Sequence, residues 1–308
     1  MPLAHILLAL LVILIWGINF VFVKFALDAL SPYTLCALRF VMVSVPAVFF
    51  IKRPPVSIKL IALYGTTMFG LQFCLLFIGI HAGVSPGLAS LVMQVQVFFT
   101  MFYAAMLWHE KPSRWQLSGA IISFTGIGLV AMHLDAHVTW KGLIFVLLSA
   151  ASWGWGNVIS KSIGKVNMVG LVVWGSFVIS LPMILVSLYF DGYQNMLTSY
   201  QHLNWLTIIS ILYVVYISTW VGYTVWSWLL SHHPVSSVSP FTLLVPIVGM
   251  LSSTLVLDES FQLWKLGASV LVIGGLVVNI IGTRYFAKYT AKGQRTGLPK
   301  SVLELKTD

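Results

Sequence analysis

Long apolar stretches recur along the whole chain, and they constrain its fold more than any other feature. Each covers about 19–28 residues, enough to cross roughly 30 Å of hydrocarbon as a helix. The alternating segments of about ten residues that a transmembrane barrel needs are absent. Charged residues make up 8% of the 308 residues, against about 25% in soluble domains, so they cannot coat a soluble fold of this size. The sequence therefore predicts an all-α integral membrane protein.

The apolar stretches predict about ten transmembrane helices joined by short connections that contain proline and glycine. The expected spans are residues 4–27, 33–51, 58–80, 85–108, 114–133, 140–162, 167–190, 203–230, 235–257 and 262–285. The first stretch lacks the basic region that opens a signal peptide, so we expect it to remain as a span.

Lysine and arginine positions predict the orientation of these spans. If the N-terminus is cytoplasmic, the cytoplasmic loops and tail hold 13 of the 17 basic residues, and the opposite side holds three. Because cytoplasmic loops of membrane proteins are enriched in Lys and Arg, both termini are predicted to be cytoplasmic. The net charge of +9 then reflects orientation in a lipid bilayer, and no nucleic-acid partner is expected.

The two halves of the chain share residues in the same order. Trp16-Gly17 and Lys24 match Trp153-Gly154 and Lys161 at a distance of 137 positions, and Glu110, Trp115 and Leu117 match Glu259, Trp264 and Leu266 at a distance of 149. We predict two five-span repeats over residues 1–137 and 138–287, followed by a basic cytoplasmic tail over 288–308. Because five is odd, the second repeat would be inverted, which is typical of transporters with a site near the membrane midplane.

The sequence also resembles a known family. The similar stretches are residues 16–20, 37–40, 87–90 with Gln94 and Gln96, 110–119, 153–157, 244–246 and 258–259. Over about residues 4–285 the chain resembles the EamA family of the drug/metabolite transporter superfamily, and within it the exporters of cysteine and O-acetylserine. One departure is that Glu259 to Gly267 is one residue shorter than Glu110 to Gly119. The resemblance implies a multi-pass protein of the bacterial inner membrane that exports small amino-acid metabolites.

Polar and aromatic side chains inside the predicted spans are the candidates for substrate binding, because polar groups at the bilayer centre are costly. The candidates are Trp16, Asn19, Arg39, Gln72, Gln94, Gln96, Trp153, Asn157, Lys161, Tyr216, Trp220 and Tyr223. Arg39 could bind a substrate carboxylate or gate access to it, and it could equally hold helix-end carbonyls or Asp28. Lys161 could equally extend its charge to the membrane surface.

Several of these candidates have an alternative structural role. Trp16 with Asn19, and Trp153 with Asn157 and Lys161, form one-face stripes that could line a cavity or bond neighbouring helices. Gln94 and Gln96 lie about 200° apart on an α-helix, so we expect one to contact substrate and the other a neighbouring helix. The 3-4-3-4 spacing from Tyr213 to Ser227 predicts a continuous aromatic seam, which could be a wall of the pathway or ordinary packing.

Other functional classes find less support in the sequence. All eight Asp and Glu residues lie outside the middle of the predicted spans, so no buried carboxylate is expected to carry a proton. Two cysteines in apolar runs indicate no disulfide framework and no metal site, and no cofactor is expected. An exporter of small metabolites is the leading hypothesis. A broad-specificity drug exporter, a channel and a membrane-embedded enzyme remain alternatives, and glycine-rich helix faces leave homodimerisation open.

Overall fold

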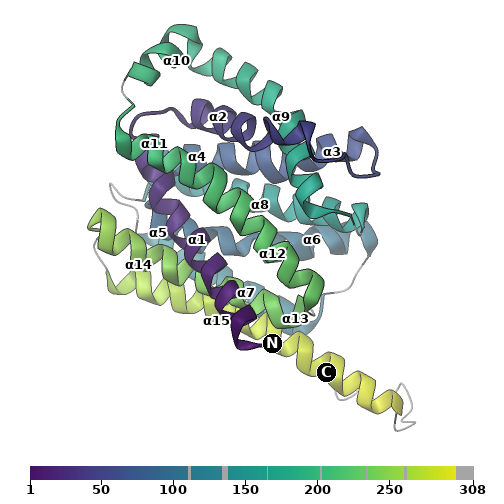
Figure 1. Cartoon of the computed structure of the whole chain (residues 1–308). Helices are drawn as coiled ribbons and strands as arrows, with labels where there is room; N and C mark the ends of the chain where they lie inside the picture. Colours follow the sequence, from purple (N-terminus) through teal and green to yellow (C-terminus); the bar gives the residue numbers. More distant parts are fainter. Residues whose placement is uncertain are drawn as a thin grey trace.

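The computed structural model describes residues 1–109, 112–133, 138–164, 166–201, 203–233, 235–259 and 262–295 of the chain. Within these residues, nine helical stretches are long and apolar enough to span a membrane, and a tenth, Phe241–Leu257, is shorter. They pack side by side into one bundle (Figure 1). The prediction of an all-α polytopic membrane protein is confirmed.

Several expected spans are built from more than one kind of helix. The α-helices are α1 (Leu3–Leu27), α2 (Pro32–Ser44), α3 (Ile58–Gly65), α4 (Gln72–His81), α5 (Pro86–Val92), α6 (Gln96–Trp108), α7 (Arg114–Met132), α8 (Trp140–Ile163), α9 (Met168–Phe190), α10 (Gly192–Gln201), α11 (Trp205–Leu212), α12 (Gly222–His232), α13 (Val235–Val238), α14 (Val245–Leu257) and α15 (Leu263–Arg295). π-Helical turns Thr66–Leu71 and Tyr213–Val221 join α3 to α4 and α11 to α12. The 3-10 turns are Ala47–Phe49, Met93–Val95 and Ser239–Leu244.

The end of the described chain differs from the expectation in one respect. Helix α15 continues to Arg295, ten residues beyond the expected end of the last span, and it extends past the bundle on the side where α1 begins (Figure 1). Residues 296–308 of the predicted tail lie outside the described residues.

Side-chain caps start many of these helices. The Ser31 hydroxyl accepts a hydrogen bond from the Thr34 backbone N–H at 3.0 Å at the start of α2. Ser113 and Gln116 form a complete capping box at the start of α7, as their spacing predicts. These caps satisfy N–H groups that would otherwise lack partners at a helix end.

The helices pair across the two halves of the chain. Helix α7 packs along α15, α2 along α9, and α14 along both α1 and α5. Glycines permit the closest approaches, since a Cβ on Gly119 would lie 2.4 Å from the Gly275 carbonyl oxygen. Helices α1, α2, α4, α8 and α12 surround the middle of the bundle, where the candidate site lies.

Candidate substrate cavity

A cavity of about 460 Å³ lies in the middle of the bundle. Its walls come from both halves of the chain: helices α1 to α4, the junction of α5 with α6, helix α8, the start of α9, α12 with the π-helical turn before it, and the start of α14 with the 3-10 turn before it. Nine of the twelve predicted site residues line it: Trp16, Asn19, Arg39, Gln72, Gln94, Gln96, Trp153, Asn157 and Tyr223. The fold thus brings together candidates that are far apart in the sequence.

Among the described residues, Arg39 on α2 is the only Lys or Arg that lines this cavity, and it is 2% exposed. Its Nη2 donates to the Thr219 hydroxyl at 3.1 Å, and its guanidinium carbon lies 3.8 Å from the centre of the Phe73 ring. Nε and Nη1 find no acceptor among the described residues. Asp28, the alternative partner, is instead paired with Lys24 on α1. Two guanidinium donors are therefore available to a bound anion.

Two amide oxygens complement these donors. Asn19 Oδ1 and Gln72 Oε1 are buried at the cavity and find no donor among the described residues. Leaving such a group buried and unsatisfied costs about 1–3 kcal/mol. A ligand that carries both an anionic acceptor and N–H donors would satisfy both sets of groups. Among the described lining residues none is Asp or Glu, so the cavity holds no carboxylate to compete for Arg39.

Aromatic rings form one wall of the cavity. Trp16 lies between Tyr223 and Trp226, with ring centroids 5.6 Å and 5.3 Å away. Its indole N–H donates to the Ser218 carbonyl at 3.1 Å. Trp16 therefore lines the cavity and also bonds a neighbouring helix, which combines the two alternatives that its sequence position left open.

Gln94 and Gln96 both line the cavity, contrary to the expectation that only one faces it. The 3-10 turn Met93–Val95 explains the difference. A 3-10 helix advances about 120° per residue instead of 100°, which brings side chains two apart closer in direction. Gln96 also accepts a hydrogen bond from Asn157 Nδ2 at 2.8 Å, and Asn157 donates to the Thr100 hydroxyl at 3.1 Å.

The prediction that the aromatic residues of the eighth span form one continuous helix face is wrong. Residues Tyr213–Val221 form π-helical turns, whose hydrogen bonds reach five residues and change the direction of each side chain. Tyr216 is 41% exposed and lies outside the cavity lining. Trp220 lines a separate void of about 10 Å³, and Tyr213 donates to the Ile15 carbonyl at 2.9 Å.

Lys161 lies apart from the main cavity. It lines a second cavity of about 270 Å³ at the ends of α6 and α8, where its Nζ lies 4.2 Å from the centre of the Trp108 ring. Asn157 lines both cavities. Sequence reasoning missed Tyr64, Met68, Phe73 and Trp226 as lining residues of the main cavity. Of these four residues, only Trp226 could have been found from the sequence. It lies three residues after the candidate Tyr223, a spacing that places both side chains on one face of an α-helix.

The main cavity reaches toward the side of the bundle where the chain begins. Ser160 near the end of α8, Met168 at the start of α9 and Leu230 near the end of α12 all line it, and successive spans place these ends on the side of the α1 start. On that side His5 and His233 form a 2.6 Å ring-nitrogen contact. The pKa of His233 is lowered by burial and then by the charges of His5, the N-terminal amine and His232, which favours a neutral ring near pH 7.

On the opposite side, α2 and α9 are held together by one carboxylate. Asp191 accepts hydrogen bonds from the Thr34 hydroxyl at 2.8 Å, from the Ser187 hydroxyl at 3.0 Å and from the Ser31 hydroxyl. Hydrogen bonds to a charged group are worth about 1.5–3 kcal/mol each. Phe22 on α1 also stacks on Tyr213 at a centroid distance of 4.0 Å. These contacts join the two halves of the chain on the side away from the α1 start.

A helical membrane protein with a central cavity, lined by both halves of the chain and holding unpaired donors and acceptors, has the architecture of a membrane transporter. The family model of the EamA-like transporter family matches this chain twice, over residues 3–132 and 140–281. The chain belongs to the EamA-like transporter family.

Known proteins resemble the chain over most of its length. A "Probable amino-acid metabolite efflux pump" of Salmonella typhimurium is 38% identical over 90% of this chain and 95% of that protein. A protein of the same name from Escherichia coli K12 is 37% identical over the same shares of both chains. A solved crystal structure with 14% identity superposes with a TM-score of 0.61 over 89% of this chain and 95% of that one. That likeness shows the shared fold.

Proposed function

We propose that this protein exports small zwitterionic amino-acid metabolites, such as cysteine or O-acetylserine, by alternating access. The observation that carries the proposal is the buried guanidinium of Arg39 at the cavity: its Nε and Nη1 find no acceptor, and the lining includes no carboxylate, among the described residues. The names of the two bacterial relatives support an amino-acid metabolite as the cargo.

The lining groups match the two charges of an α-amino acid. A carboxylate is bound best by the planar donor fork of Arg39. An ammonium group would donate to Asn19 Oδ1 and Gln72 Oε1 and would be attracted to the faces of nearby aromatic rings. Side-chain selectivity would then come from the apolar part of the wall, including Met68 and Met93.

Transport would use two inverted repeats, residues 1–137 and 138–287, that rock around the cavity. Several features recur in both halves and support this division. The third and eighth spans each contain a π-helical turn, and the fourth and ninth each contain a 3-10 turn. His109 and Asp258, which are 149 positions apart, both end a helix with a left-handed backbone conformation. The two matches to the family model add further support.

The charge distribution supports an orientation with both termini in the cytoplasm of the bacterial inner membrane. In that orientation the cavity would open toward the cytoplasm and be closed on the outer side, which is the state in which an exporter receives its substrate. The described spans carry no central carboxylate, so flux would be facilitated or driven by substrate exchange and would not rely on a single Asp or Glu as proton carrier.

The orientation predicts that both termini are protected from outside reagents. Single cysteines at residue 2 and in the tail, in a background where Cys36 and Cys74 are replaced by serine, should resist an impermeant thiol reagent in intact cells. Both should react after the membrane is permeabilised. Labelling of either one in intact cells would contradict the proposed orientation.

The function itself is tested by uptake into everted membrane vesicles, in which an exporter carries solute inward. We expect saturable uptake of labelled neutral amino-acid metabolites, faster when the vesicles are preloaded with unlabelled substrate and little changed by a pH gradient. Amino alcohols and amines that lack a carboxylate should compete poorly. Equal uptake of unrelated drugs would favour the broad-specificity exporter, linear unsaturable flux would favour a channel, and chemical change of the solute would favour an enzyme.

A further inference from the structure

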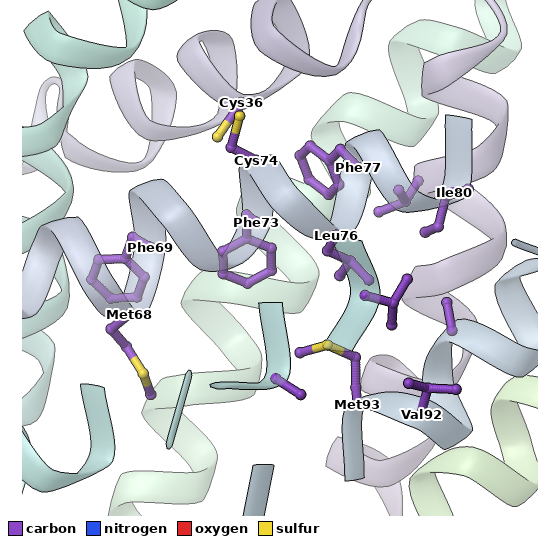
Figure 2. Packing of buried hydrophobic residues seen from close by; sticks show 14 of the residues in the cluster. Cys36, Met68, Phe69, Phe73, Cys74, Leu76, Phe77, Ile80, Val92 and Met93 are labelled. Atoms are coloured by element: carbon purple, nitrogen blue, oxygen red, sulfur yellow. The ribbon is translucent and has the colours of Figure 1, made fainter. Parts of the chain in front are cut away.

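Three sulfur atoms from three different helices meet inside the bundle. Cys36 lies on α2 and Cys74 on α4, and Figure 2 shows their two sulfur atoms next to each other. Cys36 Sγ lies 3.7 Å from Sδ of Met183 on α9. All three side chains are at most 8% exposed, and the thiols are not joined by a disulfide.

We propose that Cys36, Cys74 and Met183 form a binding site for a soft monovalent cation, Cu(I) or Ag(I). Thiolate and thioether sulfurs are the ligands that such soft ions prefer. With metal–sulfur bonds of about 2.3 Å, a trigonal site separates its sulfur atoms by about 4 Å. The distance of 3.7 Å between the Cys36 and Met183 sulfurs is therefore close to what a trigonal ion needs, with little movement of the helices.

The binding step balances in atoms and in charge. The two S–H bonds break, both protons pass to water, and three metal–sulfur bonds form without any transfer of electrons. The bound unit carries a single negative charge, because two thiolates and one monovalent cation combine with a neutral thioether. Arg39 lies three residues after Cys36 on the same face of α2, which places a positive charge near the site. The site therefore has a counter-charge built into its surroundings.

Sequence reasoning predicted no metal site, and the reason lies in the ligands. The two cysteines are 38 positions apart on different helices, and the third ligand is a methionine, a residue type abundant in apolar spans. Among the described residues, no three His, Cys, Asp or Glu side chains form a metal-binding group. Only the packing of α2 against α9 adds the thioether.

A bound ion would also link the two halves of the chain. Cys36 and Cys74 belong to the first half and Met183 to the second. An ion held by all three would join α2 and α4 to α9 next to the cavity, where Arg39 and Phe73 also lie. Rocking of one half against the other would then be restrained while the ion is bound.

The site is tested by titrating reduced, purified protein in detergent under anaerobic conditions with Cu(I), in competition with the chromogenic chelator bicinchoninate. We expect one Cu(I) per chain and the release of two protons per ion. Cys36→Ser and Cys74→Ser should each lose competitive binding. Met183→Leu keeps size and apolar character but removes a direct ligand. It should weaken binding by at least the roughly 10-fold that loss of an outer-shell partner costs at metal sites.

Met106→Leu is the matched control, because Met106 is 52% exposed on the outside of α6, and it should bind Cu(I) like the unchanged protein. Size-exclusion profiles identify any variant that does not fold, and Met183→Leu is the variant least expected to unfold. Equal Cu(I) binding by the unchanged protein, by Met183→Leu and by the Cys36→Ser/Cys74→Ser double variant would overturn the proposal. So would the absence of competitive binding by the unchanged protein, which would assign the three sulfurs to core packing alone.

Discussion

Replacing Arg39 with alanine is expected to weaken substrate transport severely while the protein still inserts into the membrane. Within the described part of the chain, Arg39 is the only Lys or Arg that lines the main cavity, and two of its nitrogen atoms find no acceptor there. Removing one partner of a buried, hydrogen-bonded charge pair costs about 2–5 kcal/mol, which corresponds to a loss of affinity of roughly 30-fold to several thousand-fold. Uptake of labelled substrate by everted vesicles, measured at several concentrations, reports this loss.

Arg39→Lys separates the charge from the geometry of the donor fork. Lysine keeps the positive charge but cannot make two parallel hydrogen bonds to a carboxylate, so this variant should transport with an apparent affinity between those of the unchanged protein and Arg39→Ala. Lys59→Ala, which removes an exposed positive charge at the start of α3, should transport normally. If Arg39→Ala is present at normal abundance and transports at the normal rate, the cavity recognises its substrate through its amide and aromatic groups instead.

The second large effect concerns the packing of α7 against α15. Gly275→Val should destabilise the protein strongly, because a Cβ there would lie 2.3 Å from the Gly119 carbonyl oxygen and 2.3 Å from the Ser123 hydroxyl. Overpacking costs about 1–3 kcal/mol where side chains can adjust, and here one neighbour is backbone. We expect the midpoint of thermal unfolding, followed by fluorescence-detected size exclusion in detergent, to fall by several degrees or the folded protein to be lost.

Gly274→Val is a closely matched control for this prediction. It changes the neighbouring residue of the same helix, with the same gain of a β-branched side chain, but nothing lies within 4 Å of its Cβ position. Its unfolding midpoint should stay close to that of the unchanged protein. A similar fall for both variants would mean that the valine itself is unfavourable in α15 and that the contact with α7 is not responsible.

The candidate site could be predicted from the sequence wherever a residue's chemistry alone made it costly in a membrane. Asn19, Arg39 and Gln72 are polar side chains in the middle of apolar stretches, and all three line the cavity. Phe73 and Tyr64 also line it, but an aromatic residue in an apolar span is indistinguishable from one that contacts lipid or a neighbouring helix.

Predictions that assumed one uniform α-helix were the ones that failed. Gln94 and Gln96 share the cavity because a 3-10 turn separates them. Tyr216 points away from the cavity because π-helical turns interrupt the eighth span. The direction of a side chain accumulates from the rotation of every residue before it, so one altered turn redirects all that follow.

The sequence by itself determined that this chain is a polytopic helical membrane protein and where most of its spans lie. Those properties follow from the length and apolar character of continuous stretches, which are local and survive any packing of the helices. Only the tertiary structure decided which side chains meet. It brings Arg39, Asn19 and Gln72 to one cavity, and it places the Cys36 sulfur next to those of Cys74 and Met183. Such meetings depend on how far each helix rotates and how closely its neighbours approach, and contacts between all the helices set both.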